Sequence, residues 1–232
     1  MWSNVWNDSL SKEWQFNTTV ALIEWIDDLE RDRMPSLILN SLITNTTLHS
    51  KDWRLKNVTS AELVELMQWS DLLLFDYLTG NYDRVASMQD AALKQNNTTI
   101  LKETIHNLVK STKTNSIWMI DNESGFLDAY WLMYSQKNGN ESKFFQDFHD
   151  SVLNTNCIFR RSTVEHLRLL RSHPNPNKLL IDFIVQYEPT FKRQLSLIKT
   201  DYLRYFTQYF RQRIDRVFNH FDNCKVITSV TH

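Results

Sequence analysis

The stretch PTFKRQLSLIKTDYLRYFTQYFRQRIDRVFNHFD, residues 189–222, decides the fold class of this chain. Its apolar side chains recur at three- and four-residue spacing, and its single proline stands at the first position, where a helix tolerates it. The pattern predicts one long helix from Thr190 to Asp222, roughly 50 Å in length. Such a helix exceeds one side of a compact domain of this size, so we expect a central strut or a dimer element. Its candidate contact residues are Phe206, Tyr209 and Phe210.

The composition of the whole chain agrees with a helical fold. Only three Gly and four Pro occur in 232 residues, whereas sheet proteins need many of both for their turns. We therefore expect an all-α fold, a single domain over residues 1–232 with nine or ten helices. The scarcity of glycine also argues against a Gly-rich phosphate loop or a dinucleotide fold, and no such string is present.

Cap residues and apolar spacing place several of these helices. Thr59 and Glu62 have the spacing of a capping box, and Gly80 is well placed to end the helix that they begin. Ser162 and Glu165 suggest a second capping box. Apolar positions predict further short helices over residues 82–92, 101–109, 127–134 and 144–152.

The N-terminal part carries aromatic and aliphatic residues in two groups. A first helix, within residues 1–16, would present Trp2, Trp6 and Leu10. A second helix would carry an apolar stripe made of Leu22, Trp25, Ile26 and Leu29.

Charge is divided unevenly along the chain. Residues 1–157 hold 13 Lys/Arg against 21 Asp/Glu, and residues 158–232 hold 13 against 6. A basic face on the long helix is therefore an alternative site, for nucleic acid or an acidic partner. It would consist of Arg204, Arg211, Arg213 and Arg216.

Three acidic residues suggest a different alternative. Asp27, Asp28 and Asp32 are similar to the aspartate clusters with which helical diphosphate enzymes hold magnesium. No matching acidic run follows on a second helix, and Arg31 and Arg33 alternate with the acids as on a solvated surface. A Mg-dependent all-α enzyme remains the alternative, and we expect the chain not to be an enzyme.

The cysteines and the N-terminus bear on the compartment. Cys157 and Cys224 are too few for a disulfide framework, so we interpret them as buried thiols. The N-terminus does not read as a signal peptide, and no apolar run is long enough for a membrane span. Eight Asn-x-Ser/Thr sequons are present, which we interpret as loop and cap residues of an intracellular protein.

A family resemblance comes from LLLFDYLTGNYDRVASMQDAAL, residues 72–93. This stretch resembles the helix, glycine, tyrosine and short-helix segment of TRF-homology domains in telomere proteins. The resemblance implies a nuclear adaptor at the telomere that joins the double-strand-side and single-strand-side subunits of shelterin and restrains telomerase. Such a protein would not itself bind DNA.

The resemblance also implies a partner site on the early helices. Trp and Tyr are favoured anchors for a protein partner because they bury a large area with few rotatable bonds. We therefore expect short segments of shelterin subunits to dock on the N-terminal aromatic groups defined above. The resemblance further implies a zinc ion shared with a partner, for which His49 is the candidate ligand, and a homodimer is an alternative assembly.

Overall fold

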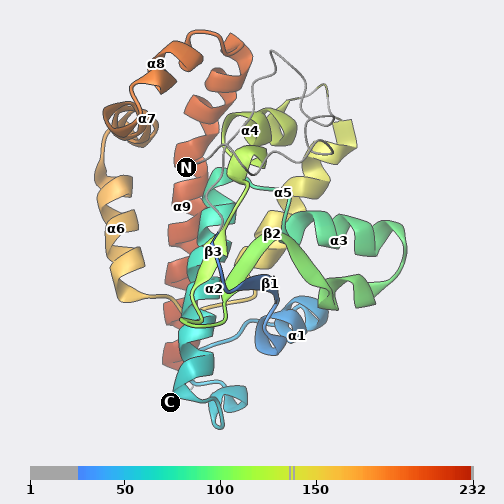
Figure 1. Ribbon diagram of the computed structural model, residues 1–232. Coiled ribbons are helices and arrows are strands. Elements are labelled where there is room, and N and C mark those ends of the chain that lie inside the picture. The colour runs from blue at the N-terminus through green and yellow to red at the C-terminus, as the bar shows by residue number, and fades with distance from the viewer. Residues whose placement is uncertain (1–25, 136, 138, 231–232) are drawn as a thin grey trace, which may run out of the picture.

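The computed structural model describes residues 26–135, 137 and 139–230, which fold as a set of helices with one small sheet (Figure 1). The strands are β1 (Leu29–Arg33), β2 (Thr104–Ser111) and β3 (Ile117–Met119). The helices are α1 (Ser36–Thr44), α2 (Ser60–Thr79), α3 (Val85–Lys94), α4 (Leu127–Tyr134), α5 (Gly139–Leu153), α6 (Arg161–Ser172), α7 (Pro176–Tyr187), α8 (Thr190–Leu195) and α9 (Thr200–Val230). Short 3-10 helices cover Trp53–Leu55, Thr98–Lys102 and Asn122–Ser124. The expectation of a largely helical fold is confirmed.

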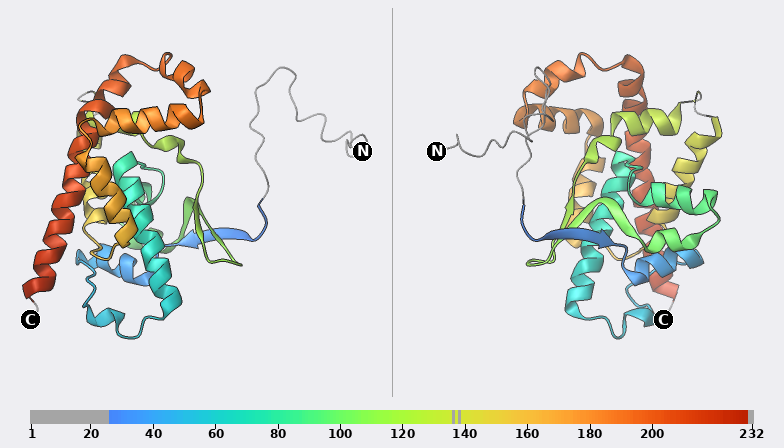
Figure 2. Two further views of the ribbon diagram at one scale, coloured as in Figure 1. Left: turned by 90° about the vertical axis from the view of Figure 1, so that its left-hand side faces the viewer. Right: turned by 45° about the vertical axis from the view of Figure 1, so that its right-hand side comes forward.

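Helix α2 is the central element. It begins with the expected capping box, since Thr59 Oγ1 accepts from the Glu62 amide and the Glu62 carboxylate accepts from the Thr59 amide. It ends at Gly80, which has the left-handed conformation with φ 71°. The sheet lies on one side of α2 and α9 lies on the other (Figure 2). Both boundaries of this helix are therefore local properties of the sequence.

Two apolar clusters form the core, and α2 contributes to both. Trp69 and Leu72 pack with Ile105 and Leu108 of β2, on the side of α1 and the sheet. Further along the same helix, Leu74, Tyr77 and Leu78 join the second cluster, between α4 and α9. The second cluster is rich in aromatic rings, among them Tyr130, Phe206, Phe210, Phe218 and Phe221.

The sheet corrects two sequence-based expectations. Its strands are antiparallel in the order β1-β2-β3. Residues 101–109, expected to be helical, instead end a 3-10 helix and form most of β2, and Asn107 is in the left-handed conformation with φ 59°. Ile26 and Leu29 do not share a helical stripe, because Asp28 has φ 66° and Leu29 begins β1, paired with Ser111. Strand partners elsewhere in the chain decide both segments.

The long C-terminal helix is also corrected. Residues 190–222 are not one helix, because α8 ends at Leu195 and α9 begins at Thr200. The bend between them brings Leu195 and Ile198 toward α7, together with Phe206 of α9. A straight helix would carry these side chains away from one another. The second expected capping box is absent as well, since α6 has Arg160 at its N-cap without a side-chain hydrogen bond.

Helix α9 packs on the chain's own core over much of its length. Phe206 and Phe210 are 2% and 3% exposed, and Tyr209 stacks on Tyr134 with ring centroids 3.9 Å apart. No helix in the described ranges is long and apolar enough to span a bilayer.

Candidate active site

The first part of the candidate site is the tight loop that follows α2, from Gly80 to Arg84. At Gly80 a Cβ atom would lie 2.4 Å from Cε of Met133, so the close approach of α4 and the positive φ both require glycine here. The Asn81 side chain then accepts a hydrogen bond from the amide of Asp83 at 2.9 Å. This short-range bond closes a turn that presents Asp83 and Arg84 immediately after the helix.

Arg84 connects this loop to two other segments. Its side chain is fully buried, and it donates to both oxygens of Asp76, with Nη2 2.8 Å from Oδ1. Nη2 also donates to Oδ1 of Asn122 at 2.7 Å, and Nη1 donates to the carbonyl of Ile120 at 3.2 Å. A single guanidinium therefore joins α2 to the segment that follows β3.

The ion pair between Asp76 and Arg84 lies in a dry environment. Burial raises the pKa of Asp76 to about 6, and the hydrogen bonds from Arg84 oppose that rise. A buried charge is costly unless its partner remains in place. The junction is therefore sensitive to loss of either residue.

Two carboxylates stand at this junction without a cationic partner among the described residues. Asp83 is half-buried, and its Oδ2 accepts from Nδ2 of Asn107 at 2.7 Å. Asp121 is exposed, lies two residues after the end of β3 and has the left-handed conformation with φ 53°. Non-glycine residues with positive φ are uncommon, and here Asn107 and Asp121 both belong to the same small region.

A buried histidine contacts the backbone of the loop that follows α2. His149 on α5 hydrogen-bonds the Asn81 carbonyl through Nε2 at 2.9 Å, and Arg213 on α9 contacts its Nδ1 at 3.1 Å. Burial, together with the charge of Arg213, lowers the pKa of His149 to about 3. Since an arginine can only donate, we assign a neutral imidazole that donates from Nε2 to Asn81.

The two carboxylates of this arrangement offer two chemical functions. An unpaired carboxylate can accept a proton from a bound hydroxyl, and a second carboxylate can bind a hard cation such as Mg²⁺. Both carboxylates are carried by loops that Arg84 locks together. We therefore treat Asp83 and Asp121 as the candidate functional pair.

Sequence reasoning missed this pair, although residues 72–93 include Asp83 and Arg84. The available signal was an Asp in a tight loop after an apolar helix, and a second Asp directly after the apolar run Ile117–Ile120. Protein kinases have a similar order of residues, with one Asp in the catalytic loop and a second Asp in a later loop.

The partner-binding residues that the sequence predicted do not lie at this junction. Trp2, Trp6, Leu10, Leu22 and Trp25 lie outside the described residues. Ile26 is 42% exposed, and Leu29 lies in β1.

The three acidic residues near the N-terminus do not form one site. Asp28 pairs with Lys113, whereas Asp32 is buried on β1, where burial raises its pKa. The expected basic face is dispersed too: Arg213 is buried and donates to the Tyr77 carbonyl, Arg211 binds carbonyls after α6, and Arg216 pairs with Asp150. Arg204 and Arg216 are exposed, and each is in an ion pair, Arg204 with Asp201 and Arg216 with Asp150.

His49 lies near the C-terminal helix. It is half-buried, its Nδ1 has no hydrogen bond within the described part of the chain, and burial lowers its pKa. Its charge acts on His220, which in turn lies 3.4 Å from Sγ of Cys224. Zinc binding at His49 with a partner remains a prediction.

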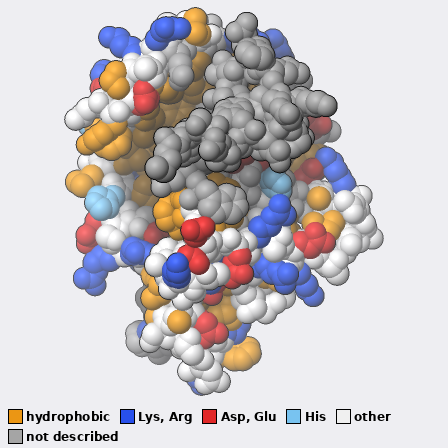
Figure 3. Space-filling model, viewed as in Figure 1, with side chains coloured by type: hydrophobic (Ala, Val, Ile, Leu, Met, Phe, Trp, Pro, Cys, Tyr) orange, Lys and Arg blue, Asp and Glu red, His pale blue; other side chains and the backbone are white. Residues whose placement is uncertain are grey.

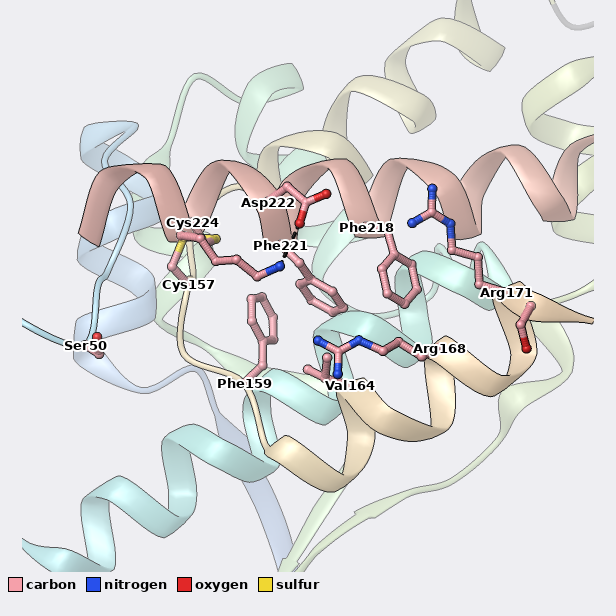
Figure 4. A pocket seen from close by; sticks show the side chains of 12 residues that line it. Ser50, Cys157, Phe159, Val164, Arg168, Arg171, Phe218, Phe221, Asp222 and Cys224 are labelled. Atoms are coloured by element: carbon pink, nitrogen blue, oxygen red, sulfur yellow. Dashed lines mark hydrogen bonds and ion pairs between the residues drawn. A yellow bond between two sulfur atoms is a disulfide. The ribbon is translucent and has the colours of Figure 1, made fainter. Parts of the chain in front are cut away.

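The two cysteines form a disulfide, which corrects the expectation of buried thiols. Cys157 and Cys224 lie 67 residues apart in sequence, and the bond ties the segment before α6 to α9. It lines a cavity of about 680 Å³ together with Phe159, Phe218 and Phe221 (Figure 4). Disulfides persist in oxidising compartments, so this bond argues against the predicted nuclear location.

Loss of the disulfide should lower stability measurably. For the double variant Cys157→Ser/Cys224→Ser we expect the free energy of unfolding to fall by about 4 kcal/mol, because a loop of this length is freed in the unfolded chain. Urea denaturation with and without a reductant measures the effect. The reductant should shift the midpoint of the wild type and leave that of the double variant unchanged, and an unshifted wild type would contradict the prediction.

The fold and the junction together define a mostly helical protein with a small antiparallel sheet and two carboxylates, one in the loop after α2 and one after β3. The chain belongs to the four-jointed box protein family, since the model of the four-jointed box protein middle domain matches residues 1–227.

Individual relatives agree with this assignment. The chain is 28% identical over 220 residues to four-jointed box protein 1 of Xiphophorus maculatus, covering 92% of this chain and 45% of that protein. It is 25% identical over 224 residues to the human four-jointed box protein 1, covering 97% and 47%. It is 28% identical over 215 residues to the "extracellular serine/threonine protein kinase four-jointed" of Drosophila melanogaster, covering 74% and 35%. The chain therefore spans less than half the length of these relatives, and no solved structure matches it.

These findings overturn the telomere interpretation. The family is not the TRF-homology family, and the chain is not a relative of the shelterin bridge Poz. The predicted role as a telomere adaptor, its shelterin partners and its nuclear location are accordingly wrong. The resemblance failed because a helix, a glycine and a short helix recur in many folds. One relative is named as a kinase, which conflicts with the expectation that the chain is not an enzyme.

Proposed function

We propose that this chain carries the phosphoryl-transfer residues of a secretory-pathway serine/threonine protein kinase. The observation that carries the proposal is the Arg84 junction, which holds one carboxylate on the loop after α2 and another after β3. Support for the reaction class comes from the Drosophila relative, which is named an extracellular serine/threonine protein kinase.

Asp83 is the proposed proton acceptor. Asn107 holds Oδ2, and Oδ1 has no hydrogen bond within the described ranges, so one oxygen remains open to a substrate hydroxyl. The serine or threonine oxygen bonds to the terminal phosphorus of ATP, ADP leaves, and Asp83 takes the hydroxyl proton. A positioned base of this kind contributes roughly a hundredfold to ten-thousandfold in rate.

Asp121 is the proposed ligand for magnesium. Its carboxylate is exposed and unpaired within the described residues, and carboxylate oxygens are the ligands that Mg²⁺ prefers. When bound, Mg²⁺ with ATP supplies the phosphoryl group and offsets its negative charge. Arg84 positions the neighbouring Asn122, and through it the loop that presents Asp121.

Metal removal tests this proposal in the full-length protein. We expect transfer of labelled phosphate from ATP to a mixed serine/threonine peptide library, abolished by EDTA and restored by excess Mg²⁺. Asp121→Asn should raise the Mg²⁺ concentration that gives half-maximal rate at least tenfold, because the ligand loses its charge. Asp147→Asn, an exposed carboxylate on α5, serves as the matched control.

The outcome of that assay is decisive. Activity that persists in EDTA, or an Asp121→Asn protein with the Mg²⁺ dependence of the wild type, would remove Asp121 from the proposed role. Absence of phosphate transfer in a folded full-length protein would sink the kinase proposal itself.

A further inference from the structure

A second feature lies next to the candidate pair, an apolar cavity of about 440 Å³. Ile181 and Ile184 of α7, Leu195 of α8 and Phe206 of α9 line it on one side, and residues 123–128 close it on the other. Figure 3 shows hydrophobic side chains in a hollow on the upper left, where α7 and α8 lie in Figure 1. Cavities of this size and polarity are typical of ligand sites.

The wall of the cavity is tied to the same helix end as Asp83. The Phe126 amide donates to the carbonyl of Thr79, the last residue of α2, at 2.6 Å. A Cβ atom on Gly125 would lie 3.3 Å from Cβ of Thr79, so the two segments are in close contact. Thr79 precedes Asp83 by four residues, and the cavity residue Glu123 follows Asp121 by two. The cavity wall is therefore continuous along the chain with the segments that carry Asp83 and Asp121.

Backbone strain marks the same wall. Phe126 has φ 58° although it is not glycine, and its ring makes edge contacts with Phe75 and Phe206. Strain of this kind persists only where the surroundings hold it, and it concentrates at ligand sites. The wall is accordingly preformed.

The charge at the cavity mouth is negative. Glu123 and Asp128 are exposed carboxylates, and no Lys, Arg or His lines the cavity among the described residues. An apolar group with a basic neighbour fits this combination. Residues 1–25 of the chain do not match it, because they contain one Lys against Asp8, Glu13 and Glu24.

We propose that the cavity binds a large apolar side chain of the polypeptide substrate, next to a basic residue and a few positions from the phosphorylated serine or threonine. This inference rests on the proposed kinase function and names its substrate class. It makes Ile184 and Asp128 specificity-determining residues. Apolar pockets discriminate by roughly tenfold or more for each apolar group lost.

A positional peptide library provides the experiment, with the full-length protein and Mg-ATP. The wild type should select Leu, Ile or Phe at one fixed position from the acceptor, and Lys or Arg beside it. Ile184→Ser should lower kcat/KM for the selected peptide by about tenfold relative to kcat/KM for a peptide with Ala at that position. Asp128→Lys should remove the preference for the basic neighbour.

The control variant is Phe183→Ser, on the same helix but 56% exposed and outside the cavity lining. It should keep the wild-type preference. A library without positional preference, or an equal loss in Phe183→Ser and Ile184→Ser, would overturn the proposal.

Binding separates this proposal from the kinase proposal. Binding of the Asp83→Asn protein to the same immobilised library is measured, because binding can be detected without phosphate transfer. Selective binding of apolar-basic peptides, lost in Ile184→Ser, would support the cavity even if no phosphate were transferred. If the intact protein bound no peptide of the library, and bound one only after deletion of residues 1–25 or on dilution, the cavity would be occupied by that segment or by a second copy, and either result would refute a substrate site.

Discussion

Replacement of Asp83 by Asn is expected to lower kcat for phosphate transfer by about a hundredfold to ten-thousandfold, the usual contribution of a positioned general base. Asparagine keeps the shape of aspartate, and its carbonyl oxygen can still accept from Asn107. The loop should therefore remain folded. The KM for ATP should change little, because the variant removes the proton acceptor rather than a nucleotide contact.

Steady-state kinetics with saturating Mg-ATP measure this effect, and circular dichroism checks the fold. The Asp147→Asn protein again provides the matched control, since it loses one carboxylate at an exposed position on α5. A folded Asp83→Asn protein with the kcat of the wild type would show that another group accepts the proton.

Arg84→Met is expected to cost about 3–5 kcal/mol of unfolding free energy, the usual effect of breaking a buried ion pair from one side. The variant leaves Asp76 buried without its cation and frees the Asn122 side chain and the Ile120 carbonyl. By contrast, Arg204→Met removes an exposed pair with Asp201 and should cost less than about 1 kcal/mol.

A second substitution separates the charge from the geometry. In Arg84→Met/Asp76→Leu no buried charge is left unpaired, so much of the lost stability should return. Phosphate transfer should stay impaired, because the guanidinium that joins the loop after α2 to the segment after β3 is still missing. Full activity in the double variant would show that Arg84 serves stability alone.

The pH dependence of the single variant provides a further check. Removal of Arg84 removes the influence that lowers the pKa of Asp76, so that pKa should rise further above 6. Below the raised pKa, Asp76 is protonated and no charge is buried. The stability deficit of Arg84→Met relative to the wild type should therefore shrink as the pH falls through that value. Urea denaturation at pH 5 and pH 7.5 measures the difference.

Local signals in the sequence were sufficient for much of the helical framework. The capping box at Thr59, the glycine at position 80 and the apolar spacing between them define α2 without reference to any distant residue. Helix α4 and much of α9 follow from the same periodicity. A short apolar run does not by itself distinguish a strand from a helix. Residues 104–111 form β2 because β1 and β3 pair with its two edges, and no local pattern reveals those partners.

The candidate site depended more strongly on the tertiary structure. From sequence, Arg84 resembles any surface arginine, and its burial against Asp76 and Asn122 appears only when α2 and the segment after β3 are in contact. The disulfide has the same origin, because 67 residues separate Cys157 from Cys224 and only packing of α9 brings the two sulfur atoms together.

The sequence by itself therefore determined a mostly helical chain with few turns and an aromatic core, because caps and apolar periods act over a few residues. The tertiary structure alone decided which arginine is buried, which carboxylates remain unpaired and which cysteines join. These properties depend on contacts between segments that are tens of residues apart, and a contact at that range leaves no pattern in the local sequence.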